Sequence, residues 1–180
     1  MRVITPDYDV DVLEDGITHI NIYTGGKTEL GRFLSNFTHM EQDTEHGRFS
    51  SLEGYYHYLK LMRSVNEADI PDIIRDDMIA IISRLKSMYG KEAQNYGREL
   101  RQQLIYKRIW INDKPNEFFH ECFRKALITK IDTSPFKELF YETTLPFTHY
   151  YVFRGAVIYK PHFSWLEELV NNIRYGVKHV

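Results

Sequence analysis

Cysteine is almost absent from this chain of 180 residues, which contains only Cys122. One cysteine cannot form an internal disulfide, and small secreted domains usually depend on disulfides, so we exclude a disulfide-stabilised scaffold and expect a cytoplasmic protein. The sequence also lacks any apolar run near the roughly 20 residues that a membrane helix needs. Its first residues carry no apolar signal sequence, and we therefore expect neither export nor a membrane partner.

An excess of charge of one sign is missing as well. The chain balances 23 Lys and Arg residues against 25 Asp and Glu residues, with a formal net charge of -2 and a pI near 6.4. Bulk charge therefore gives it no general affinity for nucleic acid, although a local basic patch is compatible with the composition. Repeats, low-complexity tracts and linkers are also absent, so we expect a single domain over residues 1–180 with its core at about 18–175.

Aromatic side chains are abundant instead. The 13 Tyr, 11 Phe and 2 Trp residues make up 14% of a chain whose 43% hydrophobic and 27% charged residues are otherwise typical of a globular protein. A packed core does not obviously require so many rings. Some of them are therefore candidates for a ligand-binding surface.

The hydrophobic pattern predicts an α+β fold that is mostly helical, with a small β-sheet built from the two ends of the chain. Alternating residues at 17–23 indicate a strand that ends at Gly25-Gly26, and the polar residues 38–47 indicate an exposed connection. The remaining pattern predicts helices over 51–64, 69–88 with Gly90 as its stop, 91–103, 118–130, 135–142 and 164–174, and short strands over 150–153 and 156–159.

The most informative pattern lies at the start of the first long predicted helix. Glu53, Tyr56, His57 and Lys60 are spaced i, i+3, i+4 and i+7, which places a carboxylate, a phenol, an imidazole and an ammonium on one helix face. Such a set can bind a polar ligand or move protons.

Each of these residues also has a plain structural interpretation. Ser50-x-x-Glu53 has the spacing of a capping box, in which Glu53 would only satisfy an amide at the helix start. Tyr55 and Tyr56 have the spacing of core residues, and Lys60 can be a solvated surface charge. The Leu34–Phe37 segment can be an ordinary strand end in which Ser35 and Asn36 close a turn.

The order of several motifs resembles a known family, the NADAR or YbiA-like domain, over most of the chain from about Ile20 to Arg174. The matching segments are Leu34-Ser35-Asn36-Phe37, Ser51-Leu52-Glu53 with Tyr56-His57 and Lys60, Glu92-Ala93-x-x-x-Gly97-Arg98, Trp110, and Phe123–Lys130. The chain departs from the family pattern at its later motif. Tyr151 stands where the family has an Asp, Arg154 where it has a Trp, and His57 where Gln is commoner.

The resemblance implies a hydrolase that needs no cofactor or metal, namely an N-glycosidase acting on a nucleotide-derived riboside or an ADP-ribose conjugate. Candidate partners are a small-molecule conjugate, such as a ribosylamino-pyrimidine phosphate, and an ADP-ribosylated base in nucleic acid. Glu53 would stabilise the oxocarbenium-like state and orient water. Because the family Asp is missing, His149, Tyr151 or a water would supply the second acid or base.

The remaining candidate site residues would bind substrate. Cationic side chains suit a phosphate and aromatic faces suit a base. These candidates are Arg32, Ser35, Asn36, Phe37, Tyr56, His57, Lys60, Arg98, Trp110 and Arg154. Trp110 has an equally simple interpretation as a partly buried core residue.

Two functions from other classes compete with the enzyme. A binding module would keep the pocket and lose turnover, as the altered Tyr151 and Arg154 positions suggest. A purely structural interaction protein would use its aromatic residues as a partner surface.

Two further patterns are interpreted as structural. The His39, Glu41, Asp43, Glu45 and His46 segment lacks cysteine and a fixed ligand spacing, so we interpret it as a solvated acidic loop. His120 and Cys122 would lie on different faces of a helix, which argues against a nucleophile pair.

Overall fold

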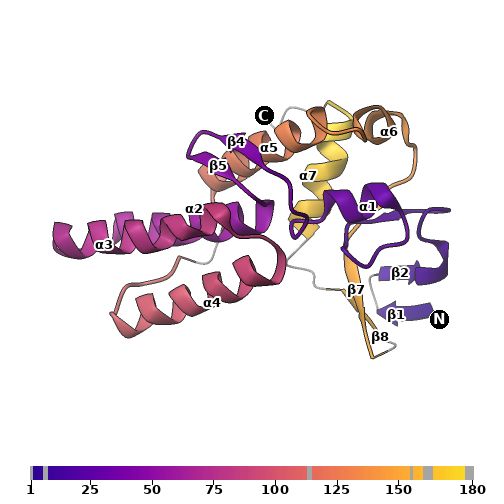
Figure 1. The fold of residues 1–180 in the computed structure, drawn as a ribbon. Helices are drawn as coiled ribbons and strands as arrows, with labels where there is room; N and C mark the ends of the chain where they lie inside the picture. Colours follow the sequence, from indigo (N-terminus) through magenta and orange to yellow (C-terminus); the bar gives the residue numbers. More distant parts are fainter. Residues whose placement is uncertain (1, 6–7, 113–114, 155, 160–163, 177–180) are drawn as a thin grey trace. The chain divides into compact units, whose positions relative to one another are not determined.

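The computed structural model describes residues 2–5, 8–112, 115–154, 156–159 and 164–176 of an α+β chain that is mostly helical with short strands, as predicted (Figure 1). The chain divides into two compact units. One consists of Met1–Ser35 with Ile131–Val180, and the other consists of Asn36–Lys130.

The helices and strands follow one another in a simple order. They are β1 (Arg2–Thr5), β2 (Tyr8–Asp11), η1 (Val12–Glu14), β3 (Ile20–Asn21), α1 (Glu29–Leu34), β4 (Gln42–Thr44), β5 (Gly47–Phe49), α2 (Leu52–Glu67), α3 (Asp72–Ser83), η2 (Arg84–Ser87), α4 (Gly90–Tyr106), α5 (Glu117–Asp132), α6 (Lys137–Glu142), β6 (Phe147–Thr148), β7 (Tyr150–Phe153), β8 (Ala156–Tyr159) and α7 (Ser164–Arg174).

The strands do not assemble into the one small sheet that the pattern predicts. Among the described residues they form two-stranded sheets, which pair β1 with β2, β3 with β6, β4 with β5, and β7 with β8. The parallel pair of β3 and β6 does join an early strand to a late one, as expected. The predicted β7 and β8 are confirmed at both ends, whereas the hinge at Gly155 lies outside the described residues.

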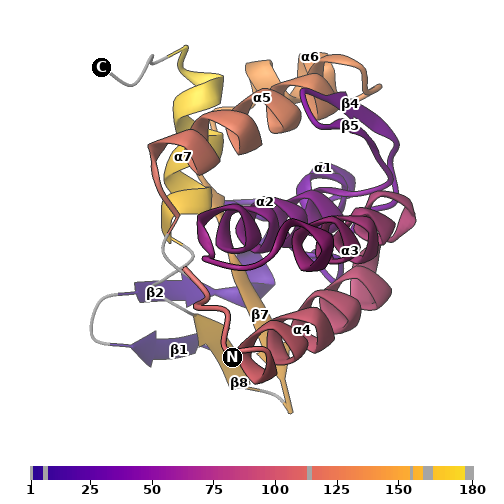
Figure 2. The same ribbon diagram turned by 90° about the vertical axis from the view of Figure 1, so that its left-hand side faces the viewer.

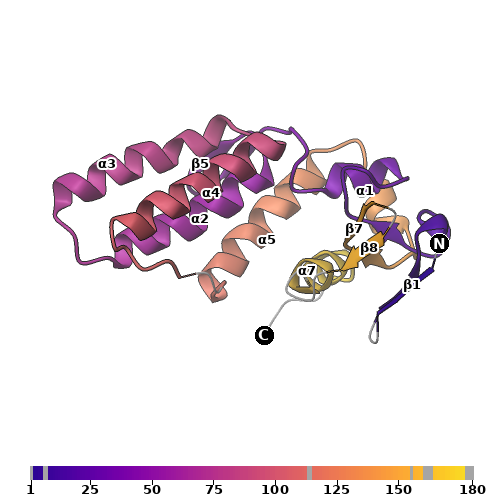
Figure 3. The same ribbon diagram turned by 90° about the horizontal axis from the view of Figure 1, so that it is seen from below.

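Helix α2 is the centre of the unit Asn36–Lys130 and packs against both α3 and α4 (Figures 2 and 3). Its start is set by Ser51, whose Oγ accepts a hydrogen bond from the Gly54 amide at 3.0 Å. Its apolar stripe includes Leu52 and Tyr55, both fully buried. The helix predicted over 51–64 is therefore confirmed and continues to Glu67.

The helix predicted over 69–88 ends earlier than expected, and Gly90 does not stop it. Helix α3 ends at Ser83, a 3-10 turn follows, and Gly90 instead begins α4 with a φ of +54° that glycine adopts without penalty. Met88, which follows the 3-10 turn, is extended, and its carbonyl accepts a long-range hydrogen bond from the Ser51 hydroxyl at 2.9 Å.

The other unit is built around the parallel pair of β3 and β6. The Asn21 side chain extends this pairing, since it donates to the Tyr150 carbonyl and accepts from the Tyr150 amide, each at 3.1 Å. Helix α7, confirmed at its predicted bounds, contacts β6, and its Arg174 donates to the Leu145 carbonyl at 2.5 Å.

The Leu34–Phe37 segment is not a strand end, contrary to that interpretation. Leu34 is the last residue of α1, and Thr28 caps this helix by accepting from the Gly31 amide at 2.9 Å. The strand expected at 17–23 is likewise reduced to β3, Ile20–Asn21. Residues 16–18 form a turn instead, in which the Ile17 and Thr18 amides donate to the Glu14 carbonyl. The alternation of apolar and polar residues does not indicate this turn.

Candidate functional site

Glu53 lies in the first turn of α2 and is buried, with 7% of its surface exposed. The capping box that would have explained it is wrong, because the cap is Ser51 and its partner is the Gly54 amide. The carboxylate is therefore not used to hold the helix start. A carboxylate in the first turn is favoured by the positive end of the helix dipole.

The carboxylate of Glu53 is paired with the imidazole of His57, one turn further along α2. Glu53 Oε1 lies 3.2 Å from His57 Nε2. The two atoms are close, but their orientation does not make a hydrogen bond, and buried Nε2 has no hydrogen-bond partner among the described residues. Buried polar atoms nearly always have hydrogen-bond partners, so Nε2, which contacts the Glu53 carboxylate without hydrogen-bond geometry, is a candidate contact for a ligand.

Asn36 contacts Glu53 through the backbone and carries a buried polar atom of its own. Its carbonyl accepts a hydrogen bond from the Glu53 amide at 2.9 Å, which fixes the Asn36–Phe37 segment against the start of α2. Its side-chain Oδ1 is buried without a hydrogen-bond partner in the described part of the chain. The structure thus brings together Asn36, Glu53 and His57, as the motif order predicts.

Helix α4 joins the same site through a glycine. A Cβ atom built on Gly97 would lie 2.3 Å from Cγ of His57, so the imidazole packs directly on the backbone of α4. Only glycine allows this approach. The neighbouring Arg98 is exposed to solvent.

Tyr56 and Lys60 lie on α2 close to the pair, but Tyr56 is also part of an aromatic cluster. Its ring meets Phe119 and Phe123 of α5 edge-on, with centroids 5.6 and 6.4 Å apart. Lys60 Nζ lies 3.4 Å from the Tyr56 hydroxyl and 5.1 Å from the ring centroid. Lys60 is half-buried rather than a fully solvated charge.

Trp110 is not brought to Glu53. It is 85% exposed, which also rules out the core interpretation. Nearby Asn112 donates its amide to the Ser64 hydroxyl at 3.3 Å, about three helical turns beyond Glu53 on α2.

Five of the predicted site residues belong to the other unit. Arg32 donates to the Gly26 and Lys27 carbonyls, Ser35 is buried at the end of α1, and Arg154 is exposed after β7. Tyr151 lies 6.3 Å from Tyr23 between ring centroids. These residues and the Glu53–His57 pair are thus divided between the two units.

His149, the other candidate acid or base, has a defined tautomer. Its Nδ1 lies 2.6 Å from the Ile22 carbonyl oxygen. A carbonyl can only accept, so Nδ1 carries a proton and Nε2 is the unprotonated nitrogen of the neutral ring.

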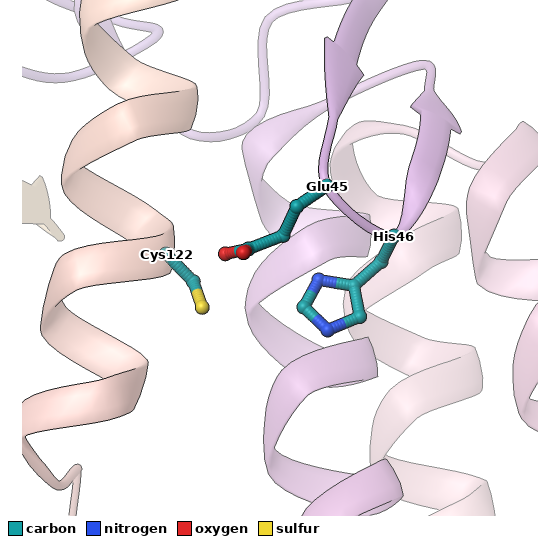
Figure 4. Close-up of side chains that lie close together, drawn as sticks. All are labelled: Glu45, His46 and Cys122. Atoms are coloured by element: carbon teal, nitrogen blue, oxygen red, sulfur yellow. The ribbon is translucent and has the colours of Figure 1, made fainter.

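One cluster was missed by the sequence interpretation. Glu45 and His46, assigned to a solvated loop, lie beside Cys122 of α5 (Figure 4). No spacing rule finds this cluster, because its members come from distant parts of the chain. This cluster contains Cys122 and not His120, so it is compatible with the expectation that these two residues lie on different helix faces.

None of the helices in the described ranges combines the length and apolar character that a membrane span requires. Comparison with known proteins finds no matching family model, no matching curated protein and no matching solved structure.

Proposed function

We propose that the chain is an N-glycosidase whose acid–base centre is the Glu53–His57 pair. The observation that carries the proposal is the buried Glu53 carboxylate, 3.2 Å from His57 Nε2, on a residue whose backbone amide donates to the Asn36 carbonyl. The substrate class is a nucleotide-derived riboside or an ADP-ribose conjugate, taken from the resemblance to NADAR domains.

The chemistry needs a group that stabilises positive charge at the ribosyl C1′ and activates water. A carboxylate removed from bulk solvent does both, because its charge is less screened there. Water adds its oxygen to C1′, the electrons of the C–N bond pass to the base nitrogen, and Glu53 takes a water proton. His57, entering in its protonated form, gives a proton to the leaving nitrogen and is recharged by the proton that Glu53 took, so that free base and ribosyl product result.

The neighbouring groups have matching tasks in this proposal. The buried Asn36 amide oxygen and His57 Nε2 are polar atoms that a ribose hydroxyl or the nucleophilic water would satisfy. Lys60 supplies a positive charge for a phosphate, and the packed Tyr56 ring supplies an aromatic wall.

A direct assay tests the proposal. The purified chain is incubated with ADP-ribosylated DNA, ADP-ribosylated protein and free ribosyl-nucleotide conjugates, and release of base or ADP-ribose is measured. We expect at least one class to be hydrolysed, and release to fall in the Glu53→Gln variant. Hydrolysis that is unchanged in that variant would remove Glu53 from the mechanism.

A binding module is the second candidate, favoured by Tyr151 at the position where the resemblance leads us to expect an Asp. Tyr151 pairs with Ile158 across β7 and β8 and offers a phenol, which is not a carboxylate. Calorimetry with ADP-ribose, run beside the hydrolysis assay, separates the two functions. Binding without product supports the module, and product formation excludes it.

A further inference from the structure

Three side chains with metal-ligating atoms meet between the β4–β5 hairpin and α5. Glu45 and His46 form the tip of the hairpin, and Cys122 faces them from the helix. One carboxylate oxygen, one imidazole nitrogen and the thiol sulfur all lie within 4.8 Å of one another. Figure 4 shows the three side chains pointing toward a common space.

The hairpin tip is held in place by its own hydrogen bonds. The Thr44 hydroxyl accepts from the His46 amide at 3.1 Å and donates to the Gly47 carbonyl at 2.7 Å. Gly47 has a φ of +102°, which the turn requires and which glycine adopts readily. Hydrogen bonds of the hairpin thus fix the backbone at Glu45 and His46.

The imidazole of His46 is oriented by an aromatic platform on α2 and α5. Its ring packs against Tyr55, Tyr58 and Phe118, with centroids 5.9, 5.7 and 6.2 Å apart. The fully buried Tyr55 also places its hydroxyl 3.0 Å from His46 Nδ1. Outer partners of this kind fix a ligating imidazole in metal sites.

The donor set is selective. A thiolate, an imidazole and a carboxylate together are typical ligands of Zn²⁺ and other late first-row dications, whereas Mg²⁺ and Ca²⁺ prefer oxygen alone. Cys122 is 2% exposed, His46 is half-buried and Glu45 is exposed, so the cluster opens to solvent on the Glu45 side. Three protein ligands with an open side leave a coordination position for water.

We propose that Glu45, His46 and Cys122 form a binding site for a late transition-metal dication of the Zn²⁺ class, with water as its fourth ligand. On binding, Cys122 coordinates as the thiolate and its proton passes to solvent. The site is independent of the N-glycosidase proposal, since it uses none of the residues assigned to that reaction.

Titration of the whole chain with Co²⁺ tests the site, after treatment with EDTA and a thiol reductant and their removal. We expect one equivalent to produce a near-ultraviolet thiolate-to-cobalt charge-transfer band that Zn²⁺ abolishes by competition. Cys122→Ser should lose the band. Glu45→Gln and His46→Asn should weaken Co²⁺ binding by at least about tenfold, because loss of even an outer partner commonly costs 10–100-fold.

Matched controls come from the same loop. Glu41→Gln removes an exposed carboxylate that pairs with Arg48 at 3.0 Å, and His39→Asn removes an imidazole stacked on Tyr89. Both should bind Co²⁺ like the unaltered chain. Absence of the band, or binding that Glu45→Gln and His46→Asn leave unchanged, would overturn the proposal.

A second readout keeps the test valid if a variant folds poorly. Cys122 is the only cysteine, so alkylation of the unaltered chain reports on this thiol alone. Zn²⁺ should slow that alkylation, and Mg²⁺ at the same concentration should not. Equal alkylation rates with and without Zn²⁺ would contradict the site.

Discussion

Lys130 is the fully buried cation of α5, with 1% of its surface exposed, and it makes the stability of the protein depend on pH in a calculable way. Burial lowers the pKa of Lys130 from 10.5 to about 7. Between these two values the unfolded chain binds a proton that the folded chain does not. The free energy of unfolding must therefore rise with pH in this window.

The size of the effect follows from the pKa difference. One pKa unit corresponds to about 1.4 kcal/mol, and Lys130 is half-protonated near pH 7, so its contribution changes by about 2 kcal/mol between pH 7 and pH 9. In Lys130→Met this contribution disappears. The free energy of unfolding of the variant minus that of the unaltered chain should therefore fall by about 2 kcal/mol from pH 7 to pH 9.

Urea unfolding followed by circular dichroism at pH 7, 8 and 9 measures this difference. Burial raises the pKa values of Cys122 and Tyr55, so their contributions to the free energy of unfolding fall at higher pH while that of Lys130 rises. These contributions are the same in both chains and cancel when the variant and the unaltered chain are compared. The matched control is Lys125→Met on the same helix, since Lys125 is an exposed partner of Glu121. A difference for Lys130→Met that stays constant from pH 7 to pH 9 would contradict a lowered pKa of Lys130.

Four further substitutions test the local geometry. Gly97→Ala should destabilise the chain by about 1–3 kcal/mol in thermal unfolding, because the added Cβ would overlap His57. Helix propensity alone predicts a stabilisation of about 1 kcal/mol, so a net stabilisation would contradict the packing of His57 on Gly97. Ser51→Ala should lower the free energy of unfolding by about 1–2 kcal/mol and Ser50→Ala by less than about 0.5 kcal/mol, since Ser51 is the residue that caps α2. A larger effect of Ser50→Ala would instead support the Ser50–Glu53 capping box. Trp110→Ser should change the free energy of unfolding by less than about 0.5 kcal/mol and leave KM unchanged, because the side chain is exposed and remote from Glu53. A raised KM would place Trp110 at the substrate-binding site.

The helices of the unit Asn36–Lys130 could be predicted from the sequence because their signals are local. Helix α2 carries its cap and its apolar stripe within a few residues of each other, and periodicity is sufficient to find both. The one-face arrangement of Glu53 and His57 follows from the same helical spacing. Helix α7 and the β7–β8 hairpin were predicted at their observed bounds for the same reason.

The remainder depends on contacts between distant residues, which one sequence does not display. The periodicity with Gly90 as a stop predicts a helix to residue 88, but α3 ends at Ser83 and Met88 is extended, with its carbonyl bonded to the Ser51 hydroxyl. The residue that caps α2, Ser51, is the one that makes this long-range bond. Glu45 and His46 lie in a segment without cysteine and Cys122 lies on α5, so no local pattern joins these three residues.

The proposed catalytic role of the Glu53–His57 pair is tested most directly by comparing Glu53→Gln with Glu67→Gln in the assay of base release from the candidate conjugates. Glu67 is an exposed carboxylate at the far end of α2 that pairs with Arg63, so its variant controls for loss of charge on the same helix. We expect Glu53→Gln to lower the single-turnover rate of base release by about 10²–10⁴-fold and Glu67→Gln to leave it unchanged. Equal rates in the two variants would contradict the claim that the Glu53–His57 pair is the catalytic centre.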